Sequence, residues 1–570
     1  MKHLLVQVRR PVTTAACTRF RALSACNPTK SPASTPRRWQ HDASSESSSD
    51  LFNYTSGRWI HDEPHHQSKR RRPFNVPELK RLAASALSVP ATEVSDLRKL
   101  GEGGFNRTFL LTLRDGLTQL VARIPYPATE PKYLSVASEV ATLEYLRRRG
   151  FPVPRVLGYD ATSDNAAGTE YIFMEVAPGR CLRECWAELT TAEMARVVER
   201  IVALEARLMA LEFPVAGSLF LEQDLRCMET VRITDPCTED EGVPEEEKGG
   251  QFCVGPDVSR GLWLGKRRIL PVHRGPYTSP VDVMTAGARK EIVYLEEYGQ
   301  PVRTSKPLPH HPYKQSPREY IDSLTNYLRV APSLVPNDPA LTRNTIRHPD
   351  LQPSNIFVSD DLEITGLIDW QYTTIRPLFL QCGVPANFQS ADGEIPSLLH
   401  EPTLPAGFER LSEADQMRER ELFRSRQLHY FYLTATAHLN PLHQAALTCD
   451  LGVLRRSLCH QAAAPWDGDN VTLKADLIQL GMNWDRIARP EEADSTCPIE
   501  YGQEEVSECL QLNNVQVEME EQERLSREAL GVGSEGWVSP ERYEDVKACE
   551  DLLKAVGFNV GDSRNERVMA

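Results

Sequence analysis

The sequence lacks several features that would mark particular classes of protein. Its 570 residues contain no run of about 18 apolar residues, which a membrane-spanning helix needs, so we expect no integral membrane segment. The 13 cysteines form no Cys-x-x-Cys pair, and neither His65-His66 nor His310-His311 has a cysteine cluster as a partner. We therefore predict no zinc site, and free thiols in a reducing compartment.

Acidic residues are absent from the first 41 positions, which contain eight Lys or Arg and many Ser, Thr and Ala. A basic, hydroxyl-rich and acid-free start is typical of a mitochondrial presequence, and the alternative is a basic tail with no targeting role. We predict a presequence at 1–41 that is cleaved near 35–45, and delivery to the mitochondrion, in particular its matrix.

Acidic residues dominate the rest of the chain. The formal net charge is −14, and removal of the eight basic residues in 1–41 changes it to −22. An acidic protein is a poor candidate for binding nucleic acid or an anionic membrane, so we predict no nucleic-acid partner. The basic run Lys69–Arg72 is the exception. We interpret it as a solvated patch beside the start of a helix, because Pro77 suits the first helical position.

Residues 348–370 carry the most specific chemical pattern. The order is His348-Pro-Asp350, five positions later Asn355, then two short apolar runs at 356–358 and 364–368, and finally Asp369. Phosphoryl transfer needs a base for the substrate hydroxyl, and an Asn and an Asp that hold Mg²⁺. The spacing predicts these roles for Asp350, Asn355 and Asp369, with a β-hairpin between the last two.

The individual residues of this stretch also have ordinary structural interpretations. His348 alone suits a core histidine, and Asp350 alone suits a turn. Asp360-Asp361 is better explained as the polar turn of the hairpin than as a metal site. The phosphotransfer interpretation rests on the order in which further motifs appear upstream.

A glycine-rich segment lies between two apolar runs near residue 100. Gly101, Gly103 and Gly104 stand between 97–100 and 109–113, which predicts a strand, a loop and a second strand. Glycines without a Cβ let backbone N–H groups approach phosphate oxygens, although such a hairpin is more often only a turn.

A single cation follows in the β-rich run 120–125. We expect Arg123 to be buried there, and a buried cation needs an anion. Glu139 lies beside the apolar face of a helix predicted at 135–149, whose apolar residues are Val136, Val140, Leu143 and Leu146. We predict an Arg123–Glu139 ion pair that positions nucleotide phosphates; the alternative is a surface Arg and a solvated Glu.

These motifs, together with the strand Tyr171–Val176 and the ending Ile368-Asp369-Trp370, resemble the aminoglycoside phosphotransferase and choline kinase-like superfamily over residues 97–440. The resemblance implies an α+β, bilobal protein-kinase-like fold with a small β-rich N-lobe and a larger, mainly helical C-lobe. It implies transfer of the γ-phosphate of ATP, with Mg²⁺, to the hydroxyl of a small molecule.

Site residues follow from the resemblance at the matching positions. It implies that Asp350 is the catalytic base, that Asn355 and Asp369 bind Mg²⁺, and that Arg123 contacts phosphate. It also implies that Met174–Ala177 is the hinge that binds adenine, through Glu175 and Ala177. Gly101, Gly103, Gly104 and Glu139 complete the nucleotide site.

A closer resemblance links the segments 52–59, 74–79 and 368–380 to the fungal mitochondrial group called altered inheritance of mitochondria protein 9. This group implies a mitochondrial location and a link to mitochondrial maintenance or inheritance, but no substrate. Arg123 stands where the superfamily usually has Lys, and its forked guanidinium differs from an ammonium group. The second hypothesis is therefore a nucleotide-binding pseudokinase that acts as a scaffold. Protein kinase activity is disfavoured, because no Ala-Pro-Glu follows Asp369.

The predicted organisation follows these motifs along the chain. After the presequence we expect a linker and an N-terminal extension with one helix, the N-lobe, the C-lobe and an acidic helical extension. Within the last segment, an amphipathic helix at 539–557 is expected to pack back on the C-lobe, and a protein partner for this helix is the alternative. The boundaries are 1–41, 42–96, 97–178, 179–490, with an acidic insertion at 236–250, and 491–570.

Overall fold

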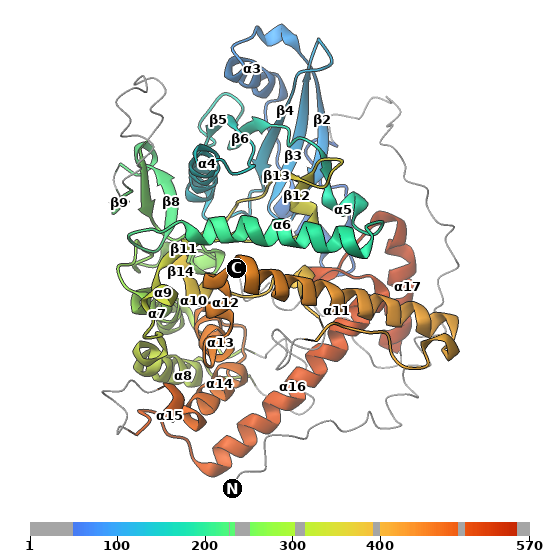
Figure 1. The fold of residues 1–570 in the computed structure, drawn as a ribbon. Coiled ribbons are helices and arrows are strands. Elements are labelled where there is room, and N and C mark those ends of the chain that lie inside the picture. The colour runs from blue at the N-terminus through green and yellow to red at the C-terminus, as the bar shows by residue number, and fades with distance from the viewer. Residues whose placement is uncertain are drawn as a thin grey trace.

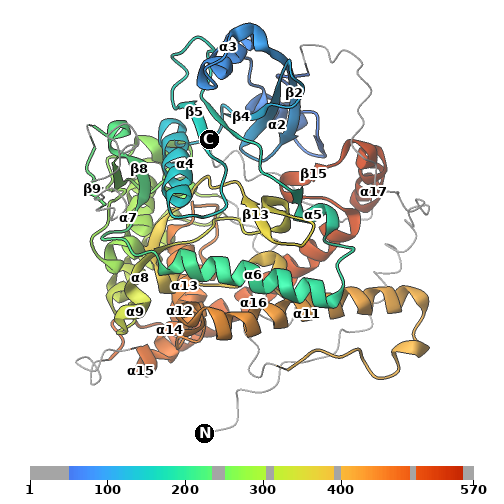
Figure 2. The same cartoon turned by 45° about the horizontal axis from the view of Figure 1, so that its top comes forward.

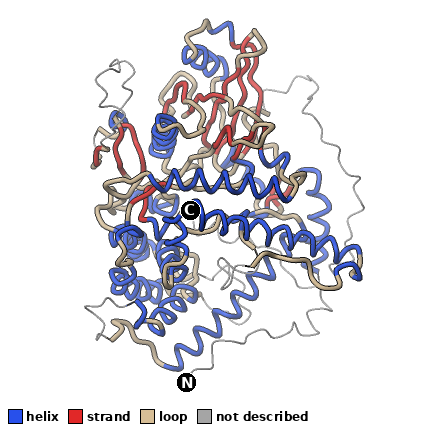
Figure 3. The backbone as a smooth tube through the Cα atoms, viewed as in Figure 1, coloured by secondary structure: helices blue, strands red, loops and turns tan. Residues whose placement is uncertain are grey.

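The structure is a computed structural model that describes residues 50–226, 228–233, 251–302, 314–390, 400–487 and 496–555. The predicted presequence at 1–41 and the acidic insertion at 236–250 lie outside the described residues. Helices and antiparallel strands are largely segregated, as an α+β fold requires (Figure 3). None of the described helices is both long and apolar enough to cross a membrane.

A five-stranded antiparallel sheet forms the part of the molecule at the top of Figure 1. Its strands, in spatial order, are β2 (Val94–Glu102), β3 (Asn106–Leu113), β4 (Gln119–Pro125), β6 (Tyr171–Glu175) and β5 (Val156–Asp160). The pleat sends alternate side chains to opposite faces. Phe109 and Leu111 of β3 pack with Leu79 of α3 (Val76–Ala86), whereas Leu110 joins the main core on the other face.

Helix α4 (Lys132–Arg148) covers that other face and is buried on nearly every side, where the sequence predicted a single apolar stripe. The reason is a second sheet that the sequence analysis missed. It consists of β8 (Ser218–Leu221), β10 (Phe252–Gly255) and β9 (Val231–Arg232), and it packs on the outer face of α4. The rings of Tyr145 and Phe252 meet edge to face with centroids 5.2 Å apart.

Helices form the remainder of the core, and several begin at capping side chains. Thr190 and Glu193 form a capping box at the start of α6 (Thr191–Ala210), and Ser412 caps α11 (Glu413–Leu439). These two helices lie side by side beneath the sheet (Figures 1 and 2). The other helices of this part, at the lower left of Figure 1, are α7 (Pro280–Tyr298), α8 (Pro317–Val330), α12 (Pro441–Leu447), α13 (Gly452–Ala463) and α14 (Val471–Met482).

The predicted hairpin is present as β12 (Ile356–Val358) and β13 (Ile364–Leu367), which pair antiparallel. Asp360 and Asp361 are exposed in its turn, as expected. Strand β7 (Arg180–Cys181) pairs with the other edge of β12. The hairpin therefore connects the hinge segment after β6 with the segment that contains Asp369.

The two terminal extensions meet each other, which the sequence did not predict. Strand β1 (Arg58–Trp59) pairs with β15 (Trp537–Val538), and the N-terminal extension contains α2 (Glu63–Arg70) and α3 where one helix was expected. Helix α16 (Gln503–Leu530) packs on α14, but α17 (Tyr543–Ala555), the helix that we expected on the C-lobe, packs instead with Ile60 of the N-terminal extension (Figure 1). We call residues 51–66 together with 531–552 the terminal clasp.

The basic run near residue 70 is not the solvated patch that we expected. Arg72 is bonded to Thr169 (2.9 Å) and Glu170, and its side chain is only 15% exposed. The guanidinium of Arg70 lies 4.5 Å from the centre of the Trp59 ring and is 3.1 Å from Glu535. The acidic partners come from distant parts of the chain, so local charge could not reveal them.

Candidate active site

His348 connects the two halves of the 348–370 motif. Its Nδ1 accepts a hydrogen bond from the backbone N–H of Asp350 (3.1 Å), and its Nε2 is 2.9 Å from the carbonyl oxygen of Ile368. One nitrogen must therefore accept and the other donate, which describes a neutral imidazole. Burial favours the same form, because it lowers the pKa of His348. The ring also meets Trp370 edge to face.

The amide of Asn355 holds the loop that carries Asp350. Its Nδ2 donates to the carbonyl oxygen of Asp350 (2.8 Å) and to the carboxylate Oδ2 (3.1 Å), and Gln352 Nε2 donates to the same Oδ2. Asn355 is buried, whereas Asp350 is exposed. The arrangement presents an oriented carboxylate to solvent, where a substrate hydroxyl could reach it.

Arg123 bridges two carboxylates. Its Nε lies 3.3 Å from Glu139 Oε2, as the sequence predicted, and its Nη2 donates to Asp369 Oδ1 at 2.5 Å, which the sequence did not predict. Burial alone would lower the pKa of Arg123, but Asp369 and Glu139 raise it, so the guanidinium stays charged.

The two carboxylates differ in their electrostatics. Burial raises the pKa of Glu139 to about 7, against the effect of Arg123. Burial also acts to raise the pKa of Asp369, but the charge and the hydrogen bond of Arg123 outweigh it and hold this pKa below its ordinary value. Asp369 has a φ of 68°, a strained conformation for a residue with a side chain, and such strain concentrates at functional sites.

The glycine segment joins β2 and β3 as predicted, with Gly101 in β2 and with Gly103 and Gly104 in the turn. The N–H of Gly103 donates to the carbonyl oxygen of Asn106 (2.9 Å), and a Cβ added at Gly104 would meet no atom within 4 Å. Within the described residues, no bond joins Gly101, Gly103 or Gly104 to the other predicted site residues. The loop instead reaches them through Asn106, whose amide donates to Gln371 (2.5 Å), two residues after Asp369.

The hinge segment passes over the hairpin. Glu175, at the end of β6, pairs with Arg155 (3.0 Å), and the hydroxyl of Thr365 donates to the carbonyl oxygen of Pro178 (2.6 Å). A Cβ added at Gly366 would lie 3.0 Å from that of Ala177. The segment with Glu175 and Ala177 therefore lies against the strand that leads to Asp369.

A buried ion-pair network supports the loop and was missed by the sequence analysis. Arg347 precedes His348, and its Nε donates to Glu205 of α6 (2.8 Å). Its Nη2 donates to the hydroxyl of Tyr432 of α11 (3.1 Å) and to a backbone carbonyl oxygen (2.7 Å). The hydroxyl of Tyr432 in turn donates to Glu205 (2.6 Å). The only available signal was a Glu on the apolar side of the helix at 191–210.

The residues of the predicted metal site have suitable donor atoms. The carbonyl oxygen of Asn355 accepts from the N–H of Ile368 (3.0 Å), which sets Asn355 beside the segment of Asp369. The amide oxygen of Asn355 accepts no hydrogen bond from the described residues, and carboxylate and amide oxygens are ligands that Mg²⁺ accepts. The described residues contain no cluster of three or more His, Cys, Asp or Glu that could hold a metal ion. Nucleotide phosphates and water would have to supply the remaining ligands.

Comparison with known proteins places this geometry in a family. Residues 96–380 match the model of the phosphotransferase enzyme family. The chain belongs to this family. The match spans β2 to α10 (Leu378–Gln381) and so includes the glycine loop, the hinge and the 348–370 motif.

Relatives extend the similarity beyond the matched region. The chain is 31% identical to a subtelomeric hrmA-associated cluster protein of Aspergillus fumigatus, over 79% of this chain and 90% of that protein. It is 22% identical to the altered inheritance of mitochondria protein 9 of Saccharomyces cerevisiae, over 81% and 75% of the two chains, so the predicted resemblance is confirmed. Among solved structures, an ethanolamine kinase of Plasmodium vivax matches at 11% identity over 68% of this chain and 82% of that one. Its TM-score is 0.30, so this match supports no conclusion about the present chain.

Proposed function

We propose that this phosphotransferase moves the γ-phosphate of ATP, with Mg²⁺, to a hydroxyl group of a small molecule. The observation that carries the proposal is the bonding that joins three predicted groups. His348 and the Asn355 carbonyl both bind Ile368, so Asp350 and Asn355 are held beside Asp369, which contacts Arg123. We propose a bilobal arrangement, in which this centre lies between the sheet and the helices.

Each residue then has one task. Asp350 orients the acceptor hydroxyl and accepts its proton as the phosphorus–oxygen bond forms. Glu139 holds Arg123 in place. When the nucleotide enters, Arg123 releases the Asp369 carboxylate and binds phosphate oxygens. The backbone of Gly101–Gly104 covers the phosphates, and Glu175 and Ala177 receive the adenine. Mg²⁺ held by Asn355 and Asp369 would neutralise charge on the transferred group.

A catalytically inactive scaffold is the competing function, and one contact favours it. Arg123 and Asp369 neutralise each other in this structure, and a protein that never binds Mg²⁺ could keep that pair permanently. Against this stands the oriented, exposed carboxylate of Asp350, for which a scaffold has no use.

Nucleotide binding is the first test. Mg·ATP should raise the melting temperature of the full chain, by an amount that corresponds to about 2.7 kcal/mol at a concentration of 100 times Kd. Gly104→Val should lose most of this shift, because the added side chain enters open space in which only a ligand would be crowded. Gly502→Val, at an equally open glycine far from the site, is the matched control. A protein that does not respond to millimolar Mg·ATP would refute both the phosphotransferase and the nucleotide-binding scaffold.

We also propose delivery to the mitochondrial matrix, supported by the basic, acid-free segment 1–41 and by the mitochondrial relatives. A fluorescent reporter fused to residues 1–50 should enter mitochondria, and the same fusion with its eight Lys and Arg changed to Gln should stay outside. Diffuse fluorescence from the unmodified fusion would contradict the proposal.

The terminal clasp should influence the nucleotide site through Glu102. The side chain of this glycine-loop residue is fully buried; it accepts hydrogen bonds from the backbone N–H groups of Thr55 and Ser56 (both 2.8 Å) and pairs with Lys99 and Arg107. Burial acts to raise the pKa of Glu102, but these donors hold it below its ordinary value. The carboxylate therefore binds as an anion at neutral pH and fixes the loop to the clasp.

Trp537→Ala should loosen this attachment. Trp537 packs against Gly57 and donates from its Nε1 to the hydroxyl of Tyr54 (3.0 Å). We expect faster hydrogen exchange at the amides of Thr55 and Ser56, and a higher KM for ATP. Leu552→Ala, on an exposed face of α17, is the control. Unchanged exchange at both amides would show that the loop does not depend on the clasp.

A further inference from the structure

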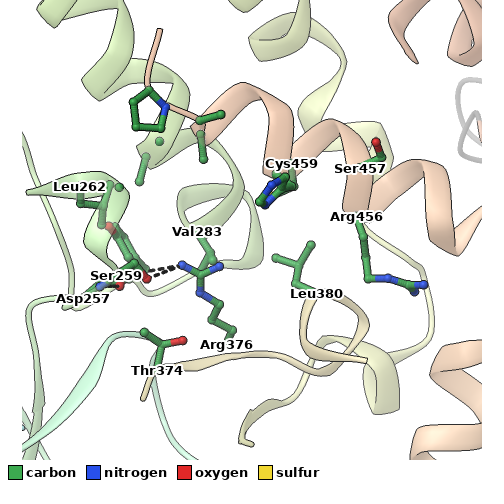
Figure 4. Close-up of a pocket in the computed structure, with 18 of the residues that line it drawn as sticks. Asp257, Ser259, Leu262, Val283, Thr374, Arg376, Leu380, Arg456, Ser457 and Cys459 are labelled. Atoms are coloured by element: carbon green, nitrogen blue, oxygen red, sulfur yellow. Dashed lines mark hydrogen bonds and ion pairs between the residues drawn. The ribbon is translucent and has the colours of Figure 1, made fainter. Parts of the chain in front are cut away.

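A cavity of about 800 Å³ lies between α7 and α13. Its walls come from the segment 257–262, from residues 374–380 around β14 (Ile375–Pro377), and from α7 and α13 (Figure 4). Ligand pockets for small organic molecules usually have volumes of about 300–1,000 Å³. The cavity is therefore large enough for a small organic molecule.

Two wall segments connect the cavity with the proposed centre. The guanidinium of Arg260 lies 5.1 Å from the centre of the Phe105 ring, which follows the glycines of the loop. The ring of Tyr372 meets the same Phe105 edge to face at 5.2 Å. Thr374 and Arg376, which line the cavity, follow Asp369 by only five and seven residues. A molecule in the cavity would thus be next to segments that reach the glycine loop and Asp369.

The charge of the lining is unbalanced. Among the described residues of the lining, the cationic side chains are Arg376 and Arg456, and the one carboxylate is Asp257. Arg376 uses Nη2 for both Ser259 (2.7 Å) and Asp257 (3.2 Å), as the dashed lines in Figure 4 mark. About a third of the side-chain surface of Arg376 (32%) remains accessible. His460 adds no further positive charge at neutral pH, because burial and Arg376 both lower its pKa.

Polar atoms without partners lie at the same end of the cavity. The buried Nε of Arg376 and the hydroxyl of Tyr277 have no hydrogen-bond partner among the described residues. Buried polar groups without partners are costly, and they call for an explanation. The rest of the lining is largely apolar, with Leu262, Val283, Ala286, Leu380 and Val453. The cavity thus combines a polar, cationic wall around Arg376 with apolar side chains.

The walls are held in place independently of any ligand. The buried ammonium group of Lys290 donates to the carbonyl oxygens of Gly261 (3.1 Å) and Ala463 (3.2 Å), both of which line the cavity. Gly287 of α7 packs directly against Ala463 of α13, where a Cβ would collide. Because the cavity is already formed, a ligand that binds there loses little binding free energy to rearrangement of the protein.

We propose that this cavity binds the phosphoryl acceptor, and that the acceptor is an alcohol with an apolar body and one anionic group that pairs with Arg376. The proposal rests on the phosphotransferase function above. In the reaction, the bond between the γ-phosphorus and the ADP oxygen breaks, a bond to the acceptor hydroxyl oxygen forms, and the hydroxyl proton passes to Asp350. The anionic group, a carboxylate or a phosphate ester, stays at Arg376 throughout.

Matched pairs of compounds test the charge preference in the full chain. Pantothenate against pantothenol compares a carboxylate with its neutral analogue, and glycerol 3-phosphate against glycerol does the same for a phosphate ester. Melting temperatures are measured with each compound in the presence of saturating Mg²⁺ and a non-hydrolysable ATP analogue. We expect a shift from at least one anionic compound, no shift from its neutral partner, and a loss of affinity of about ten-fold or more in Arg376→Gln, since hydrogen bonds to charged groups have this strength.

Two variants keep the test decisive. Ala286→Phe fills the cavity without touching Asp257 or Arg376 and should abolish the same shift, which covers the case in which Arg376→Gln does not fold. Arg318→Gln, on an exposed position of α8, should behave like the unmodified protein. The inference fails if no anionic compound shifts the melting temperature, or if the shift survives in Ala286→Phe. A missing response to the ATP analogue itself would instead contradict the proposed function.

Discussion

Asp350→Asn should lower phosphotransfer by about 10²-fold or more, because general-base catalysis contributes about 10²–10⁴-fold. The substitution keeps the size of the side chain and the hydrogen bond from Asn355, but it removes the carboxylate that would accept the hydroxyl proton. Binding of Mg·ATP should remain, since the base contacts the acceptor and not the nucleotide. The measurement is phosphate transfer by the purified protein, or rescue of a null mutant at equal protein level.

Asp361→Asn is the matched control, because Asp361 is an exposed turn residue of the neighbouring hairpin. Asp369→Asn should also abolish activity, by removing a charged oxygen ligand for Mg²⁺ and a partner of Arg123. Full rescue of the null mutant by Asp350→Asn would make the scaffold the better hypothesis, since a scaffold needs no base.

Arg347→Ala should destabilise the protein by about 3–5 kcal/mol, since it leaves the carboxylate of Glu205 buried without its cation. The side chain of Glu205 is only 1% exposed, so water cannot replace the guanidinium. The loop with His348 and Asp350 follows Arg347 directly, so activity should fall with stability. Urea unfolding at neutral pH measures the change in free energy of unfolding.

The double variant Arg347→Met with Glu205→Gln distinguishes the effect of an unpaired buried charge from a simple loss of packing. Removal of both charges avoids an uncompensated buried ion, so the double variant should be more stable than Arg347→Ala. Arg329→Ala, at an exposed position of α8, should change stability little. A double variant less stable than Arg347→Ala would contradict the assignment of the loss to a buried unpaired charge.

Much of the local structure could be predicted from the sequence. Thr190 with Glu193 and Ser412 with Asp415 marked helix starts, because a cap needs only residues three positions apart. The apolar runs around the glycines predicted β2 and β3, and those after Asn355 predicted β12 and β13. Short strands of mixed composition, such as β8 and β10, carried no comparable signal, because their burial comes from packing on α4.

The candidate site was predicted in part. The spacing from His348 to Asp369 identified the segment, and the Arg123–Glu139 pair followed from the need of a buried cation for an anion. Arg123 also contacts Asp369, and Asn106 contacts Gln371. These contacts join residues about 250 positions apart in the chain. No periodicity or spacing in one sequence indicates that two such distant residues are in contact.

By itself, the sequence determined the order of the phosphotransferase motifs, the local elements that carry them, and the family to which the chain belongs. Those features depend on residues a few positions apart, which propensity, capping and hydrophobic period report directly. Only the tertiary structure decided that Arg70 and Arg72 are half-buried in ion pairs, that β1 pairs with β15, and that Arg376 lines a cavity. The partners of these residues come from distant segments, and packing of the whole chain selects them.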